Sequence, residues 1–212
     1  MIVPSLSFEE IIKHFERDFT FIQHKTLAFR DGVLREFLNT QLSRCTRSVE
    51  MIAPSRNRWL VFYSMTRSPR HIDAFHLLYY DDDSGIHTIK KLIVGAGANA
   101  DVAYARQDGH FYHRYNTRMS LGITKPIEVI KYFHKHNGEF LEKFEREENE
   151  DGSVNVFATV REGIILGVQY RKEKYSLYKT FVTDAMLHKE QKDLAAFMRD
   201  PAIQEEIWKK GQ

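Results

Sequence analysis

The chain has few of the features that mark disulfide-stabilised or membrane-spanning proteins. Its 212 residues include a single cysteine, Cys45, so an intrachain disulfide is impossible and a metal site would need other ligand types. No apolar run approaches the ~18 residues of a membrane-spanning helix, and the first residues lack the basic and apolar segments of a leader peptide. These absences predict a cytoplasmic protein that does not enter a membrane.

An excess of charge of either sign is also absent. Lys and Arg number 31 against 29 Asp and Glu, which gives a net charge of +2 without a long block of like charge. A protein that binds nucleic acid over a wide surface is usually more basic, so any such surface here must be local. Hydrophobic residues make up 42% of the chain and aromatic residues 13%, which predicts a folded core.

The first half of the sequence predicts helices followed by strands. Ser7 and Glu10 form a capping-box pattern before apolar residues at helical spacing, which predicts a helix from residue 8. Apolar spacing predicts a second helix over 29–47. Segments dense in aromatic and aliphatic residues then predict an antiparallel meander separated by turn-like stretches. Its strands are expected at 58–65, 72–80 and 86–94, with a short fourth at 102–106.

The second half repeats this order of helices and strands. Helices are predicted from about 109 to 121 and over 125–136, and an acidic, turn-rich insert covers 139–153. A second meander is predicted over 154–160, 163–171 and 175–182. Thr183 is the expected N-cap of a further helix, and Asp200 and Pro201 open a short terminal one. The predicted class is α+β, with antiparallel meanders flanked by helices in one unit over 1–212. A subdivision into 1–100 and 101–212 is the alternative.

One basic and aromatic segment, HFYHRYNTRM at 110–119, is the main candidate for a functional site. On a helix, His110, Arg114 and Arg118 fall on one stripe beside an apolar stripe. Arginines hold phosphate through forked hydrogen bonds, and histidine transfers protons near neutral pH. The apolar stripe is expected to be buried and consists of Phe111, Tyr115 and Met119. The alternative is structural: the arginines form salt bridges and stack on tyrosines, and His110 caps the helix.

Thr180, on the last predicted strand, is the fourth candidate residue because its hydroxyl can donate to a phosphate oxygen. The basic helix, the strand GIILGV (163–168) and KTFV (179–182) together resemble the RelE-like and colicin-like ribonuclease toxin superfamily, the barnase–EndoU–colicin–RelE fold. Small phage-associated members are the most similar, and the resemblance covers residues 105–185. The chain as a whole also looks like an uncharacterised bacterial family built around HF-x2-RYN-x-R.

The resemblance implies metal-independent RNA cleavage that needs no cofactor. In this reading, His110 is the general acid or base, Arg114 and Arg118 stabilise the phosphate, and Thr180 assists them. RNA is the implied substrate, and an inhibitor or partner protein is the other implied partner. If the site is catalytic, we expect His110, Arg114 and Thr180 to converge within a few ångströms in an open groove.

The rival hypothesis is a non-catalytic protein with the same fold that serves a structural or protein-interaction role. Its aromatic strands (59–63 and 75–80) and basic helix would then bind a partner protein. In that case, we expect Arg114 and Arg118 to be paired with acidic residues. The candidate acidic residues are Glu128, Glu145, Glu147 and Glu148.

Three other motifs give weaker signals. GAGANA (95–100) follows an apolar run like a dinucleotide fingerprint, but no later strand ends in the required acidic residue. Asp81–Asp83 lack the spacing of a calcium loop and fit a hairpin turn with Gly85. Histidines of the two central helices suggest zinc, but two rings in H-x-H on a helix point nearly opposite ways, so no metal is predicted. These histidines are His110, His113, His134 and His136.

Overall fold

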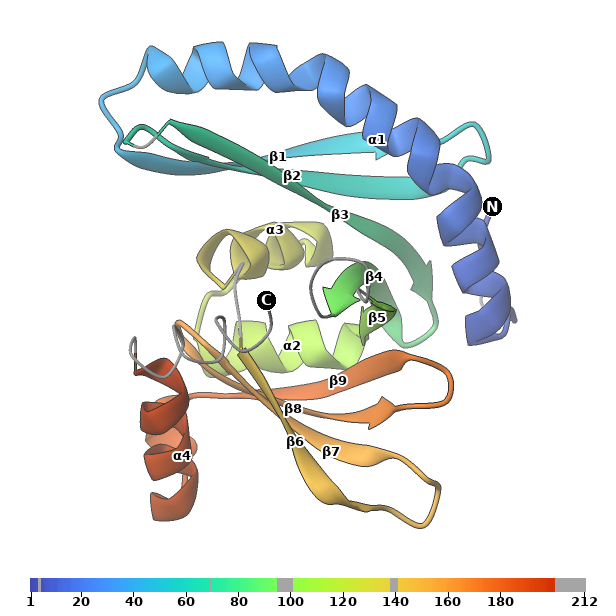
Figure 1. Cartoon of the computed structure of the whole chain (residues 1–212), viewed down its shortest axis with the longest axis vertical. Helices are drawn as coiled ribbons and strands as arrows, with labels where there is room; N and C mark the ends of the chain where they lie inside the picture. Colours follow the sequence, from blue (N-terminus) through green and yellow to red (C-terminus); the bar gives the residue numbers. More distant parts are fainter. Residues whose placement is uncertain (4, 69, 95–100, 138–140, 201–212) are drawn as a thin grey trace. The chain divides into compact units, whose positions relative to one another are not determined.

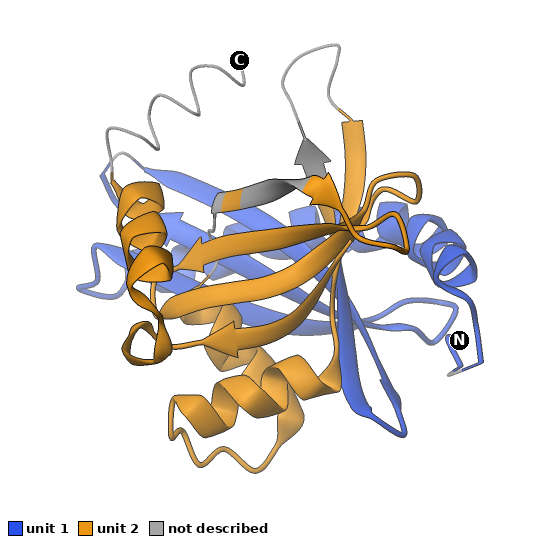
Figure 2. Ribbon diagram, turned by 90° about the horizontal axis from the view of Figure 1, so that it is seen from below, with its two compact units in different colours: residues 1–90 blue, residues 91–212 orange. Residues whose placement is uncertain are grey.

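A computed structural model describes residues 1–3, 5–68, 70–94, 101–137 and 141–200 of the chain. Contacts divide the chain into two compact units, Met1–Lys90 and Lys91–Gln212, which Figure 2 distinguishes by colour. Helices and mostly antiparallel strands build both units, which confirms the predicted α+β class. Among the described residues, no helix is both long and apolar enough to cross a membrane. The GAGANA segment and Pro201 lie outside the described residues.

The first unit begins with one long helix, α1 (Phe8–Leu38). The predicted capping box is present, because the Ser7 side chain accepts from the Glu10 main chain while the Glu10 side chain accepts from the Ser7 main chain. A buried stripe continues through Ile22 and Thr26 at intervals of three or four residues, so the helix does not break there. The predicted separate helix over 29–47 is therefore wrong: its first part belongs to α1.

The remainder of that predicted helix is a strand, β1 (Arg44–Ile52). Every residue of β1 has an antiparallel partner in β2 (Arg58–Thr66), which in turn pairs with β3 (His71–Asp82). β4 (Gly85–Val94) pairs with β3 and completes the meander. Leu42 and Cys45 fit a helical pattern in the sequence, but Leu42 is exposed, so the spacing does not mark a core stripe. The three predicted strands of the meander are confirmed.

The helix α1 lies along one face of the β1–β2–β3 sheet (Figure 1). Phe15 and Trp59 are both fully buried, and their ring centroids lie 4.7 Å apart. Phe19 stacks on Phe15 at 5.3 Å and also contacts the edge of His76 at 5.3 Å. Aromatic packing between α1 and the strands therefore forms the core of the first unit.

A buried polar link in this core involves His76. The Thr26 hydroxyl donates to the Ile22 carbonyl at 2.8 Å, so His76 Nε2 must carry the proton that is shared with Thr26 Oγ1 at 2.9 Å. The Tyr63 hydroxyl donates to the Thr26 carbonyl at 2.9 Å. Burial lowers the pKa of His76 to about 4. The folded unit therefore holds this imidazole in its neutral form.

This histidine makes the stability of the first unit depend on pH. Because the pKa of His76 is lower in the folded chain than in the unfolded chain, the unfolded state binds more protons between about pH 6.5 and pH 4. Stability is therefore fully present above that window, and about 2–3 kcal/mol should be lost as the pH falls to 4. Urea unfolding followed by tryptophan fluorescence will measure the loss, with Trp59 as the reporter in a Trp208→Phe background.

The matched comparison uses two histidines of β3. His76→Gln should remove most of the loss between pH 6.5 and 4. His71→Gln should leave it unchanged, because His71 is exposed and its ring lies 2.6 Å from the exposed carboxylate of Asp73. An identical pH dependence in the wild type and in His76→Gln would contradict the assignment to His76.

In the sequence of the second unit, one strand precedes two central helices and further strands follow them. β5 (Asp101–Gln107) precedes α2 (Gly109–Arg118) and α3 (Pro126–His136), which confirms these three predicted elements. β7 (Val154–Val160), β8 (Gly163–Tyr170) and β9 (Tyr175–Val182) confirm the second meander. The acidic segment predicted as turns is instead a strand, β6 (Leu141–Glu148), which pairs with β7.

The sheet of the second unit has the order β5-β9-β8-β7-β6. All its neighbours are antiparallel except β5 and β9, which are parallel. In both views α2 and α3 lie over one side of this sheet, and α2 packs on β9 (Figures 1 and 2). A short 3-10 helix (Asp184–Met186) and α4 (Lys189–Arg199) follow β9. Thr183 is the N-cap of the 3-10 helix and His188 is the N-cap of α4, so the single helix predicted after Thr183 is divided into two.

Candidate functional site

The predicted site helix forms where the sequence placed it. Asp108 caps α2, and its carboxylate accepts from the Phe111 main chain at 2.8 Å. Phe111 and Tyr115 are fully buried, as predicted, and Met119 is half-buried at the C-cap. The Tyr115 ring meets Phe133 of α3 and Phe181 of β9 edge-on, each at 4.9 Å. This packing fixes how α2 is rotated against the sheet.

A polar network at the other edge of Tyr115 holds α2 and α3 together. The Tyr115 hydroxyl donates to Glu162, which also accepts from the Asn137 side chain at 2.7 Å. The Glu162 main chain donates back to the Asn137 side chain at 3.1 Å. Burial first, and then the Glu162 carboxylate, raise the pKa of Tyr115. The tyrosine therefore stays a neutral donor, and the network positions the helix rather than taking part in proton transfer.

Two of the four predicted site residues meet directly. Arg118 Nη1 donates to Thr180 Oγ1 at 3.1 Å and to the Phe181 carbonyl oxygen. A guanidinium has five N–H donors, and these two bonds use only those of Nη1. Within the described residues, Nε and Nη2 carry no hydrogen bond. Strand β9 therefore orients a half-buried arginine while leaving most of its donors available.

A β-bulge sets the position of Thr180. Leu166 lies opposite Thr180 and Gly167 lies opposite Tyr178, so Lys179 is an extra residue with no partner on β8. A Cβ on Gly167 would overlap the main-chain carbonyl oxygen of Leu177. Only glycine therefore permits this approach of the strands. The sequence indicated the GIILGV strand but did not identify Gly167 or the exposed Lys179 as parts of the site.

The remaining two candidates lie farther along α2. Arg114 is half-buried and His110 is exposed. At ~1.5 Å per residue, Arg114 lies about 6 Å and His110 about 12 Å along the helix axis from Arg118. His110, Arg114 and Arg118 therefore follow one another along α2, and Thr180 of β9 contacts Arg118; we call these four residues the His/Arg line. Arg118 and Thr180 are in contact, whereas the expected convergence of His110, Arg114 and Thr180 stays a prediction.

Acidic residues do not neutralise this line among the contacts of the described residues. Arg114 makes no hydrogen bond or ion pair there, and Arg118 bonds only to β9. Glu128 instead pairs with Lys131 at 2.8 Å, and Glu148 lies 3.8 Å from Arg171. The side chain of Glu145 lies outside the description. The salt bridges expected for a purely structural helix are therefore not formed with Glu128 or Glu148.

The histidines of the two helices are dispersed. His134 is buried, and its Nε2 lies 3.1 Å from the Tyr112 hydroxyl, which donates to Gln107 at 2.8 Å. His136 Nδ1 contacts the Tyr132 carbonyl at 2.8 Å, while His113 is exposed. No group of three or more His, Cys, Asp or Glu side chains in the described part of the chain has the arrangement of a metal site.

The aromatic strands proposed as a partner-binding surface are largely inside the protein. All side chains of Trp59–Tyr63 are buried, as are those of Leu77–Tyr80. Phe75 is half-buried and stacks on Phe62 at 4.8 Å. The strand residues therefore serve the core, and the basic helix α2 is the part of the interaction hypothesis that remains.

Comparison with known proteins adds no relative. No protein-family model matches the chain, and neither the curated proteins nor the solved structures contain a match.

Proposed function

We propose that the second unit binds RNA along the His/Arg line of α2 and cleaves its backbone without a metal ion. The observation that carries the proposal is the arginine oriented by β9. Arg118 is held by Thr180 and the Phe181 carbonyl, and its Nε and Nη2 donors have no bond within the described residues. Forked donors of a fixed guanidinium match the oxygens of a phosphate.

The spacing along the line assigns different tasks to its two ends. Arg118 and the Thr180 hydroxyl, which can still donate its own proton, hold one phosphate. Arg114 and His110 are one helical turn apart and act together on the neighbouring phosphodiester. Successive phosphates of an extended RNA strand would then lie along α2, as in basic grooves that bind single-stranded nucleic acid.

The chemistry requires one proton acceptor and one stabilised phosphate. The His110 imidazole accepts the proton of a ribose 2′-hydroxyl, and that oxygen attacks the adjacent phosphorus. The bond from phosphorus to the 5′ oxygen breaks, and this oxygen takes a proton from solvent. Arg114 stabilises the charge that develops on the phosphate. The products are a 2′,3′-cyclic phosphate and a 5′-hydroxyl, so DNA, which lacks the 2′-hydroxyl, is not cut.

The order of elements in the second unit supports the same proposal. Two helices precede the antiparallel strands β6–β9, and Thr180 lies on the last strand. The ribonuclease toxin superfamily that this segment resembles has a basic helix, a small antiparallel sheet and a strand threonine or serine in this order. An inhibitor protein that covers α2 is the partner expected for such an enzyme, and the cytoplasm, where RNA is abundant, is its expected location.

The test is cleavage of a labelled single-stranded RNA by the purified full chain in the presence of EDTA. We expect cleavage by the wild type and no cleavage of the DNA of the same sequence. His110→Ala should lower the rate by about 100-fold or more while leaving RNA affinity nearly unchanged. Arg118→Ala should weaken RNA binding by about tenfold, because a charge-assisted fork is lost.

Two controls separate a site from a change in folding. His113→Ala replaces an exposed histidine about 100° around the same helix from Arg114 and should change neither rate nor affinity. Arg114→Ala should alter the free energy of unfolding by less than about 0.5 kcal/mol, whereas a buried, paired arginine would cost about 3–5 kcal/mol. Failure of the wild type to bind or cleave any RNA would overturn the proposal.

The non-catalytic alternative makes a different prediction for the same variants. If α2 only stabilises the fold, Arg118→Ala should destabilise the second unit, and the wild type should show no affinity for RNA. Binding without cleavage, with equal affinity in His110→Ala, would make the protein an RNA-binding module rather than an enzyme.

A further inference from the structure

The first unit contains an open pocket that plays no part in the proposed RNA site. Its volume is about 430 Å³, within the range of roughly 300–1,000 Å³ that is typical of small-molecule sites. Its walls come from α1, from the turn between β1 and β2 and from Met1. The lining residues are Met1, Arg17, Asp18, Phe21, Pro54 and Ser55.

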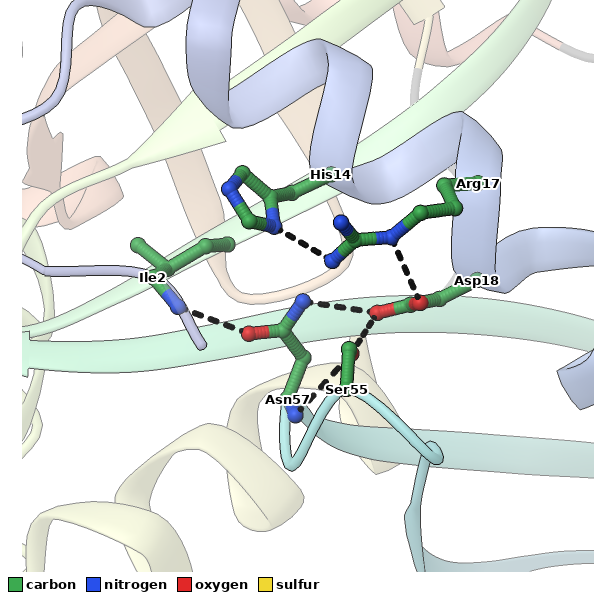
Figure 3. Close-up of polar contacts among 6 residues, drawn as sticks. All are labelled: Ile2, His14, Arg17, Asp18, Ser55 and Asn57. Atoms are coloured by element: carbon green, nitrogen blue, oxygen red, sulfur yellow. Dashed lines mark hydrogen bonds and ion pairs between the residues drawn. The ribbon is translucent and has the colours of Figure 1, made fainter.

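One wall of the pocket is fixed by a buried carboxylate, shown in Figure 3. Asp18 is only 4% exposed, and it accepts from the Asn57 side chain at 2.6 Å and from the Ser55 hydroxyl. The Asn57 side chain in turn accepts from the Ile2 main chain at 2.8 Å. These bonds tie α1, the β1–β2 turn and the first residues of the chain together. The pocket wall is therefore formed before any ligand arrives.

The same carboxylate helps to orient Arg17 toward a fixed position. Arg17 Nε lies 3.5 Å from Asp18 Oδ1, and Arg17 Nη2 donates to His14 Nδ1 at 2.7 Å (Figure 3). Because arginine only donates, the His14 ring must accept and is neutral at this nitrogen. Burial first, and then the Arg17 charge, lower the pKa of His14, which agrees with this state. Within the described residues, Nη1 of Arg17 makes no hydrogen bond.

The surroundings of Arg17 combine a positive charge with apolar surface. The Lys25 ammonium lies 5.0 Å from the centroid of the Phe21 ring, on the same stripe of α1 as Arg17. Lys25 is not among the lining residues, so Arg17 is the cation of the pocket wall. Phe21, Pro54 and Met1 supply the apolar part of the lining. Nη1 of Arg17, which has no bond within the described residues, can donate to an anion, and the apolar side chains of the lining can contact the rest of the ligand.

We infer that this pocket binds a small organic anion, a carboxylate or sulfonate on an aromatic body, with Arg17 as the anion-binding residue and Phe21 as the wall for the ring. The inference is independent of RNA cleavage, since the pocket and the His/Arg line lie in different units. The probe is 1-naphthoate, compared with the 1-naphthylmethylammonium ion, which has the same ring system and the opposite charge. Saturation-transfer NMR titration of the full chain measures both.

The expected result is saturable binding of 1-naphthoate and at least about tenfold weaker binding of the ammonium ion. Arg17→Gln and Phe21→Ala should each weaken naphthoate binding by about tenfold, and Arg17→Lys should weaken it less, because the charge remains. Arg30→Gln removes an exposed arginine of the same helix and should have no effect. Trp59 fluorescence in the Trp208→Phe background will confirm that each variant is folded.

Three outcomes would overturn the inference. They are the absence of saturable naphthoate binding to the wild type, equal affinity for the two probes, and unchanged affinity in a folded Arg17→Gln variant. None of them depends on whether the protein cleaves RNA.

Discussion

Replacing Gly167 with alanine should destabilise the second unit by about 3 kcal/mol, at the upper end of the cost of overpacking. The added Cβ would overlap the Leu177 carbonyl oxygen and would lie 3.0 Å from the Tyr178 Cα. Both neighbours are main-chain atoms, so β9 must move rather than a flexible side chain. The bulge at Lys179 would be lost or displaced, and with it the position of Thr180 beside Arg118.

Denaturant unfolding followed by circular dichroism will measure the global effect, and hydrogen exchange of residues 163–182 will locate it. Gly32→Ala is the matched control, because Gly32 lies inside α1 and, apart from the adjoining turns of the helix, no described atom lies within 4 Å of the position that an added methyl group would take. That change should stabilise the chain by roughly 0.5–1 kcal/mol, since alanine is the better helix former. If Gly167→Ala and Gly32→Ala changed the unfolding free energy equally, the close approach of β8 and β9 at Gly167 would not be the cause of the loss.

Replacing Asp18 with alanine should destabilise the first unit by about 3–5 kcal/mol. The change leaves the buried Asn57 amide and the Ser55 hydroxyl without their acceptor. It also removes the charge that partly balances Arg17. Both effects act on the attachment of α1 to the β1–β2 turn.

Trp59 fluorescence during urea unfolding measures this loss in the Trp208→Phe background. Asp31→Ala, on the exposed surface of the same helix, should change the unfolding free energy by less than about 0.5 kcal/mol. Asp18→Asn keeps one oxygen acceptor, so its loss of unfolding free energy should lie between those of Asp18→Ala and Asp31→Ala. A loss for Asp18→Ala no larger than for Asp31→Ala would mean that the network contributes little to stability.

Local signals in the sequence were sufficient for most elements. Ser7 with Glu10 placed the start of α1, and apolar segments between turn-like stretches placed β2, β3 and the second meander. They failed where tertiary pairing overrides local pattern. Leu42 and Cys45 continue a helical spacing, yet β1, which begins at Arg44, pairs with β2 along its whole length. Likewise, β6 is rich in acidic residues, and only its pairing with β7 makes it a strand.

The sequence likewise predicted one part of the candidate site and missed another. The four-residue spacing from His110 to Arg118 indicated one helical stripe, and α2 has that form. The contact between Arg118 and Thr180 depends on the packing of Tyr115 against Phe181. The spacing of residues along the sequence does not predict a contact between a helix and a distant strand. The bulge at Lys179 is a matter of strand register, which no local pattern specifies.

The contact between Arg118 and Thr180 also has a consequence for the time at which the site appears during synthesis. The two residues are separated by 62 positions, and β9 follows every other described strand in the chain. At roughly 5–20 residues per second, a ribosome needs about 3–12 s to reach Thr180 after Arg118. During that interval a nascent chain carries α2 without its partner strand, and the assembled arginine site exists only after β9 has been made.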